Sequence, residues 1–145
     1  MNEKLNEIIE KLRSEFGKNF KQDDSHTWLI EVFTEAGRSQ VVTLIYKEQY
    51  HSKENTSRLV AFSPIGPIFR DFNFEQMLRK NSELDIGAIA IEDLRNQDNI
   101  KVSYLVFRAS HLFITLDYPE AWELVVKTGE YADKLENIIY SKDTH

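Results

Sequence analysis

The chain has 145 residues, and its 18 Lys and Arg residues against 24 Asp and Glu residues give a net charge of −6. This length is typical of a single domain, and the acidic balance with scattered basic residues disfavours binding to nucleic acid. The absence of cysteine excludes a disulfide framework and a thiolate metal site.

The first predicted element is a helix over residues 2–16. Charged residues separate apolar ones that recur at the spacing of one helix face, namely Leu5, Ile8, Ile9, Leu12 and Phe16. Gly17 follows, and glycine is the residue most often found just beyond a helix. This pattern predicts an amphipathic helix that packs one face on a core.

Three strands are predicted next, over residues 27–34, 42–47 and 59–62. β-branched and aromatic residues alternate with polar ones in the first two runs, which is the period of a half-buried strand. Short polar turns separate the runs, so we expect an antiparallel meander. We expect Pro64, Gly66 and Pro67 to end the third strand.

A short helix is predicted through about Glu83, with Asn73 as its N-cap. The strand at residues 87–91 alternates small residues with isoleucine, and we place it in the centre of the sheet because both of its faces look covered. A turn at residues 95–99 leads into a fifth strand, predicted over residues 102–107.

The last predicted element is a long helix that opens at Asp117 with Pro119 in its first turn. We expect Gly129 to mark a close approach of this helix to the sheet, because glycine costs about 1 kcal/mol inside a helix. The expected buried stripe comprises Trp122, Val125, Gly129 and Ala132.

The predicted order is therefore α-β-β-β-α-β-β-α, which indicates an α+β fold with helices packed on a five-stranded antiparallel sheet. No repeat or linker divides the sequence, so residues 1–145 are expected to form one domain.

The sequence carries no recognisable catalytic motif, and no enzyme is predicted. The histidines His26, His51, His111 and His145 lack the spacing of a metal site, and no phosphate-binding loop is present. We therefore expect no catalytic residue, no metal and no cofactor. The adjacent acids Glu92 and Asp93 should point to opposite faces of a strand rather than act together.

The aromatic content is the most suggestive feature for function. Phe72, Phe74, Met77 and Leu78 cluster at the start of the short helix, which could be half-exposed and serve as a contact surface. The alternative, in which this helix only covers the sheet, is equally compatible with the pattern.

The second half of the chain resembles the type III secretion chaperone-like fold in its YbjN-like bacterial branch. The resemblance rests on residues 87–93, on the hairpin into residues 103–108, and on the closing helix with its patterns at residues 118–121 and 131–136. It implies a small acidic protein, commonly a homodimer, that binds other polypeptides without ATP. It carries no catalytic residue to transfer.

These observations predict a non-enzymatic protein-binding module, chaperone-like or adaptor in kind, with a protein partner and a homodimeric state. The alternative is a small-molecule-binding or regulatory domain with a pocket between sheet and helices. The N-terminus lacks a secretory pattern and no apolar run approaches ~18 residues. A cytoplasmic location without a membrane or nucleic-acid partner is therefore expected.

Overall fold

The computed structural model of the chain describes residues 2–140. Within them, one six-stranded sheet carries the fold, in the order β1-β2-β3-β6-β8-β7 with every neighbouring pair antiparallel. Its strands are β1 (Phe20–Asp24), β2 (Thr27–Phe33), β3 (Ser39–Lys47), β6 (Arg58–Pro67), β7 (Ala88–Arg95) and β8 (Lys101–Leu112). The α+β class is confirmed, and the expected count of five strands is wrong.

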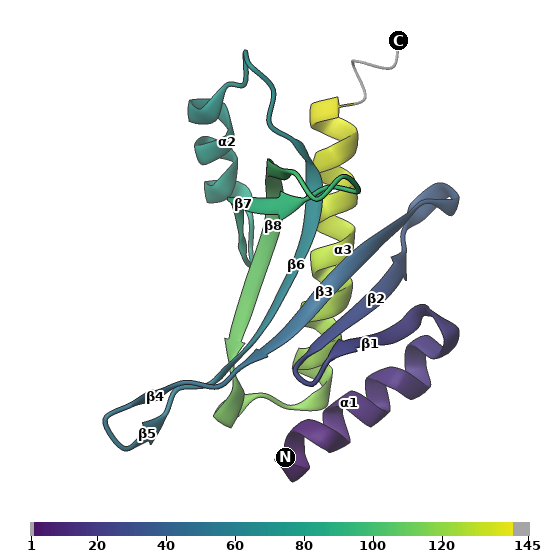
Figure 1. The fold of residues 1–145 in the computed structure, drawn as a ribbon, viewed down its shortest axis with the longest axis vertical. Helices are drawn as coiled ribbons and strands as arrows, with labels where there is room; N and C mark the ends of the chain where they lie inside the picture. Colours follow the sequence, from purple (N-terminus) through teal and green to yellow (C-terminus); the bar gives the residue numbers. More distant parts are fainter. Residues whose placement is uncertain (1, 141–145) are drawn as a thin grey trace.

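The sequence did not predict two β-structured segments, β1 and the ribbon around His51, and both are polar. β1 has the sequence Phe-Lys-Gln-Asp-Asp and lies at the edge of the sheet, where charged residues that disfavour β structure discourage pairing with other chains. The polar link around His51 is a small separate ribbon of β4 (Tyr50–His51) and β5 (Glu54–Asn55), which projects beyond the main sheet (Figure 1).

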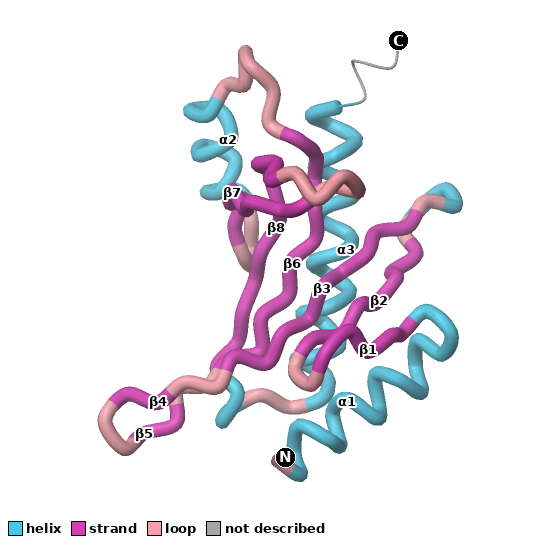
Figure 2. Tube along the Cα trace, in the orientation of Figure 1, coloured by secondary structure: helices cyan, strands magenta, loops and turns pink. Residues whose placement is uncertain are grey.

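Three α-helices lie within the described residues: α1 (Glu3–Phe16), α2 (Phe74–Lys80) and α3 (Tyr118–Tyr140). The predicted capping of α2 is confirmed, since the Gln76 N–H donates to Asn73 Oδ1 at 3.0 Å. All three helices contribute buried side chains to one core cluster with the sheet. α3 runs along four strands, β2, β3, β6 and β8, and α1 packs beside β1 and α3 (Figures 1 and 2).

The buried stripe of α3 differs from the predicted one at a single position. Val125, Gly129 and Ala132 are buried, but Trp122 is 39% exposed. Successive helix residues are about 100° apart around the axis, and the stripe is centred on Ala121 and Val125, which leaves Trp122 at its margin.

The predicted central position of the strand at residues 87–91 is also wrong, because β7 is an edge strand that pairs only with β8 within residues 2–140. Cover is partial even along one face of the strand: Ile89 and Ile91 share a face, but Ile89 is buried and Ile91 is 53% exposed. Alternation alone did not distinguish this arrangement from a fully covered strand.

The prolines do not end β6, contrary to expectation. The strand passes through Pro64 to Pro67 with a register shift between Pro64 and Gly66, and it keeps its pairing with β8. Its pairing with β3 stops at Phe62. Proline has no N–H to donate to a neighbouring strand and is tolerated at a free edge or a bulge, so the sheet divides where the prolines begin.

Candidate functional site

The α2 surface is the apolar region formed by the start of α2, the segment before it and the end of α3. The structure separates the four predicted contact residues within it. Phe72 and Met77 are each 8% exposed and belong to the core, whereas Phe74 and Leu78 are 47% and 68% exposed. Of the four, only Phe74 and Leu78 therefore present large apolar area to solvent.

A chain of aromatic rings joins α2 to the end of α3. Ring centroids are 5.3 Å apart between Phe74 and Phe72, 4.8 Å between Phe72 and Phe69, and 6.0 Å between Phe69 and Tyr140. These distances fall in the range of favourable aromatic pairs. The Tyr140 hydroxyl donates to the Pro67 carbonyl oxygen at 2.8 Å, which ties the helix end to the strand.

A hollow of about 240 Å³ opens between α2 and the last turns of α3, and we call it the α2 hollow. Its apolar wall includes Phe69 and Ile138, which are 44% and 50% exposed. Asp71, Gln76 and Lys80 supply polar groups at its border. This combination of an apolar depression and a polar border is the anatomy of a protein contact surface.

The sequence-based prediction missed half of this surface. Phe69, Ile138 and Tyr140 were not among the predicted contact residues, although an aromatic residue directly after the Pro-Ile-Gly-Pro segment is a visible signal for Phe69. Ile138 lies about sixty positions along the chain from α2, so only the fold brings this residue and α2 together.

A second hollow, of about 530 Å³, lies where β3 and β6 diverge, and we call it the sheet hollow. Val41, Pro64 and Tyr104 line it. The Gln40 side-chain amide donates to Glu136 of α3 at 2.9 Å beside it. Its size is within the range of about 300–1,000 Å³ that is usual for small-molecule sites.

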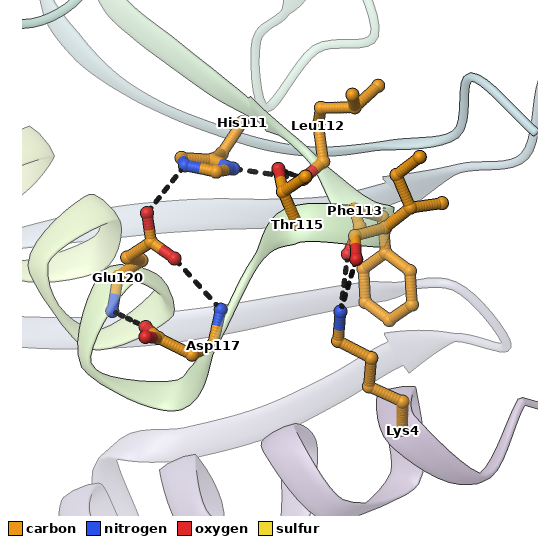
Figure 3. Close-up of polar contacts among 8 residues, drawn as sticks. Lys4, His111, Leu112, Phe113, Thr115, Asp117 and Glu120 are labelled. Atoms are coloured by element: carbon orange, nitrogen blue, oxygen red, sulfur yellow. Dashed lines mark hydrogen bonds and ion pairs between the residues drawn. The ribbon is translucent and has the colours of Figure 1, made fainter.

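Figure 3 shows the polar contacts at the turn between β8 and α3. Asp117 and Glu120 form a capping box, with N–H to carboxylate distances of 2.9 and 3.1 Å. His111 Nε2 lies 2.8 Å from a Glu120 carboxylate oxygen, and its Nδ1 lies 2.9 Å from a backbone carbonyl oxygen. Lys4 of α1 donates to the Phe113 carbonyl oxygen at 2.7 Å. These contacts hold the start of α3 and the start of α1 in place, and acceptors already occupy both imidazole nitrogens.

A bidentate ion pair joins α3 to the turn before β3. Arg38 Nε and Nη2 donate to the Asp133 carboxylate at 3.0 and 2.9 Å. The Asp133 side chain is 8% exposed and that of Arg38 is 46% exposed. Hydrogen bonding from Arg38 holds the pKa of Asp133 below its ordinary value. The arrangement is that of a structural clamp between helix and sheet.

The acids Glu92 and Asp93 have separate partners, as their adjacent positions on a strand predict. Glu92 accepts from Arg108 at 3.0 Å, while Asp93 accepts from Ser103 at 2.7 Å and lies 3.3 Å from Lys101 Nζ. The hydrogen bond from Ser103 and the charge of Lys101 lower the pKa of Asp93. The two carboxylates do not form an acid–base pair.

The histidines are not assembled into a ligand cluster. Among residues 2–140, no group of three or more His, Asp or Glu side chains is placed to hold a metal ion. The fourth histidine, His145, lies outside the described residues. In the same range no helix combines the length and apolar character needed to cross a bilayer.

Comparison with known proteins gives no match for this chain among protein-family models, curated proteins or solved structures. The resemblance to the secretion chaperone-like fold therefore stays a prediction.

Proposed function

We propose that this chain is a non-enzymatic protein-binding module, chaperone-like or adaptor in kind, that acts in the cytoplasm. The observation that carries the proposal is the α2 surface, where Phe69 and Ile138 are 44% and 50% exposed and line the α2 hollow. Phe74 and Leu78, 47% and 68% exposed, lie on another face of α2. Exposed apolar side chains that gather in one place are typical of a contact site, whereas single ones are ordinary. The occupant is an apolar segment of a partner polypeptide.

The shape of the α2 surface suits an anchor residue. A hollow of about 240 Å³ accommodates one large apolar side chain rather than a drug-sized ligand. The ion pairs of α2 and the turn after it, Arg79 with Glu75 at 3.8 Å and the partly buried Lys80 with Glu83 at 3.9 Å, are long and easily rearranged. The partner therefore binds through apolar anchors, and the charged border contributes mainly to orientation.

A photo-crosslinking experiment in the source cell tests this proposal. The crosslinker p-benzoylphenylalanine is placed at position 78, and at position 114 as a matched control, because Leu78 and Ile114 are both highly exposed apolar residues. We expect one defined protein adduct at position 78 that is absent at position 114. No adduct at position 78, or the same adducts at both positions, would overturn the proposal.

We also propose that the chain forms a homodimer in the absence of its partner, with Phe74 and Leu78 packing against the same residues of a second copy, so that the partner and the second copy compete for the α2 surface. Light scattering at micromolar concentration should then give twice the chain mass of 17.0 kDa. The variant Leu78→Asp should shift the population to the monomer. A parent chain that is monomeric throughout would show that this part of the proposal is wrong.

The sheet hollow favours small-molecule binding as a second candidate function. Its volume of about 530 Å³ exceeds that of the α2 hollow, and its border includes the exposed Val41. A metabolite that stabilises the parent chain by several degrees, but not the variant Val41→Asp, would support this candidate over the protein-binding one.

A further inference from the structure

The face of the sheet opposite the helices is open and mostly apolar. Directly opposed residues on neighbouring strands share a face, so the registers define the helix-free face in rows. One row runs through Leu29, Thr43, Phe62 and Arg108, and flanking rows contain Ile45, Val60, Val41, Pro64 and Val106. Within residues 2–140, none of these side chains belongs to the core shared with the helices.

The composition of the helix-free face departs from that of a solvated sheet. A sheet with one open face normally alternates apolar residues toward the core with polar residues toward water. Here Val60 and Val106 are 2% and 0% exposed although neither belongs to the core cluster shared with the helices. Val41 is 47% exposed. Thr43, Ser110 and Arg108 interrupt these apolar residues on the same face. Exposed apolar side chains on the open side of a sheet are typical of a contact surface.

At the end of β3 and the start of β6, this face carries two cations in an unfavourable position. Lys47 and Arg58 are directly opposed across β3 and β6, and like charges in that position destabilise a sheet. Arg58 donates only a hydrogen bond to Ser110, at 3.3 Å, and neither cation forms an ion pair with any of residues 2–140. An acidic group from a partner would relieve this repulsion.

We propose that the helix-free face binds a polypeptide segment that combines apolar residues with acidic ones. The apolar residues cover Phe62, Ile45 and Val41, and the acidic residues pair with Lys47 and Arg58. This surface is separate from the α2 surface, so the inference does not depend on the proposed function. A polypeptide fits better than a membrane or a nucleic acid, because those partners require clusters of about four to eight basic residues.

The test uses a synthetic peptide of alternating leucine and glutamate as the probe, with a leucine–lysine peptide as its matched control. The chain has no cysteine, so the variant Ser39→Cys, two positions before Val41 on β3, carries a single environment-sensitive dye on the helix-free face and leaves the proposed contact residues unchanged. We expect saturable binding of the acidic peptide, at least tenfold weaker binding of the basic one, and weaker binding at higher salt.

Two charge-reversed variants of the labelled chain complete the test. Lys47→Glu combined with Arg58→Glu should weaken binding of the acidic peptide at least tenfold. Lys18→Glu combined with Lys134→Glu changes the net charge equally at exposed sites elsewhere and should leave binding within about twofold. Four results would each overturn the proposal: no binding of the acidic peptide, equal binding of both peptides, a dye response to phosphatidylserine vesicles instead of peptide, or a response to the chain's own concentration that indicates a second copy on this face.

Discussion

The ion pair of Asp133 with Arg38 makes the stability of the fold depend on pH. The pKa of Asp133 is lowered from 3.8 in the folded chain, chiefly by hydrogen bonding to Arg38. A carboxyl whose pKa is lower when folded stabilises the fold above its unfolded pKa, and this stabilisation is lost as the pH falls through the folded value. The pKa values of Asp24, Asp85 and Asp93 are also lowered in the folded chain. The chain should therefore lose stability in acid below about pH 4.

Replacing Asp133 by asparagine tests this dependence. At pH 7 the variant Asp133→Asn should lose about 1–3 kcal/mol of unfolding free energy, because Arg38 loses its charged partner. In urea melts at pH 2 the difference between parent and variant should shrink, because acid favours the neutral carboxyl of the parent. Asp98→Asn, in an exposed turn, should change little at either pH. A difference for Asp133→Asn that is the same at both pH values would contradict this assignment.

The two tryptophans differ in burial and should differ in their contribution to stability. Trp28 in β2 is 1% exposed, whereas Trp122 in α3 is 39% exposed. Trp28→Ala should therefore cost about 3–5 kcal/mol, and Trp122→Ala about 1 kcal/mol. Urea melts of both variants give the comparison directly. Equal losses would mean that Trp122 is packed more tightly than the structure shows.

At the scale of the elements, the packing of α3 on the sheet requires a close approach of the helix to β2. A Cβ atom added at Gly129 would lie 2.8 Å from the Cβ of Val32, which is too close for an undisturbed contact. Gly129→Leu should therefore destabilise the fold by about 1–3 kcal/mol despite its better helix propensity. Glu130→Leu, one position along on the exposed face, should stay within about 0.5 kcal/mol. Equal stability of the two variants in urea melts would contradict the packing.

Periodicity predicted the elements that have a strong apolar face. α1, α3 and the strands β2, β3, β6 and β8 were all located from the sequence, although β3, β6 and β8 extend further than predicted. β1 and the β4–β5 ribbon were missed because they are held by pairing with neighbouring strands rather than by apolar alternation of their own. The edge position of β7 depends on strand order, which local sequence does not encode.

The candidate surfaces were predictable only in part. The sequence located the apolar start of α2, but burial of Phe72 and Met77 and exposure of Phe74 and Leu78 depend on how α2 lies on the core. The position of Lys47 directly opposite Arg58 depends on the register between β3 and β6. Such features arise from tertiary structure and have no signal within a short sequence window.

At the scale of the whole molecule, the three helices within residues 2–140 pack into one core on one side of the sheet, and no helix of that range covers the other side. This asymmetry gives the chain two separate apolar surfaces, one around the end of α3 and one on the helix-free face. The sheet hollow opens between diverging strands near the same end of α3. These surfaces are the basis of the proposal that the chain binds other polypeptides.

Calorimetric titration of the partner captured at position 78 tests the central claim most directly. The parent chain, Leu78→Asp and Ile114→Asp are compared at one temperature and one salt concentration. A central anchor residue contributes about 2 kcal/mol or more, so Leu78→Asp should bind about 30-fold more weakly or not at all. Ile114→Asp should bind within about twofold of the parent. Equal affinities of the parent and Leu78→Asp would contradict the claim that the α2 surface is the protein-binding site.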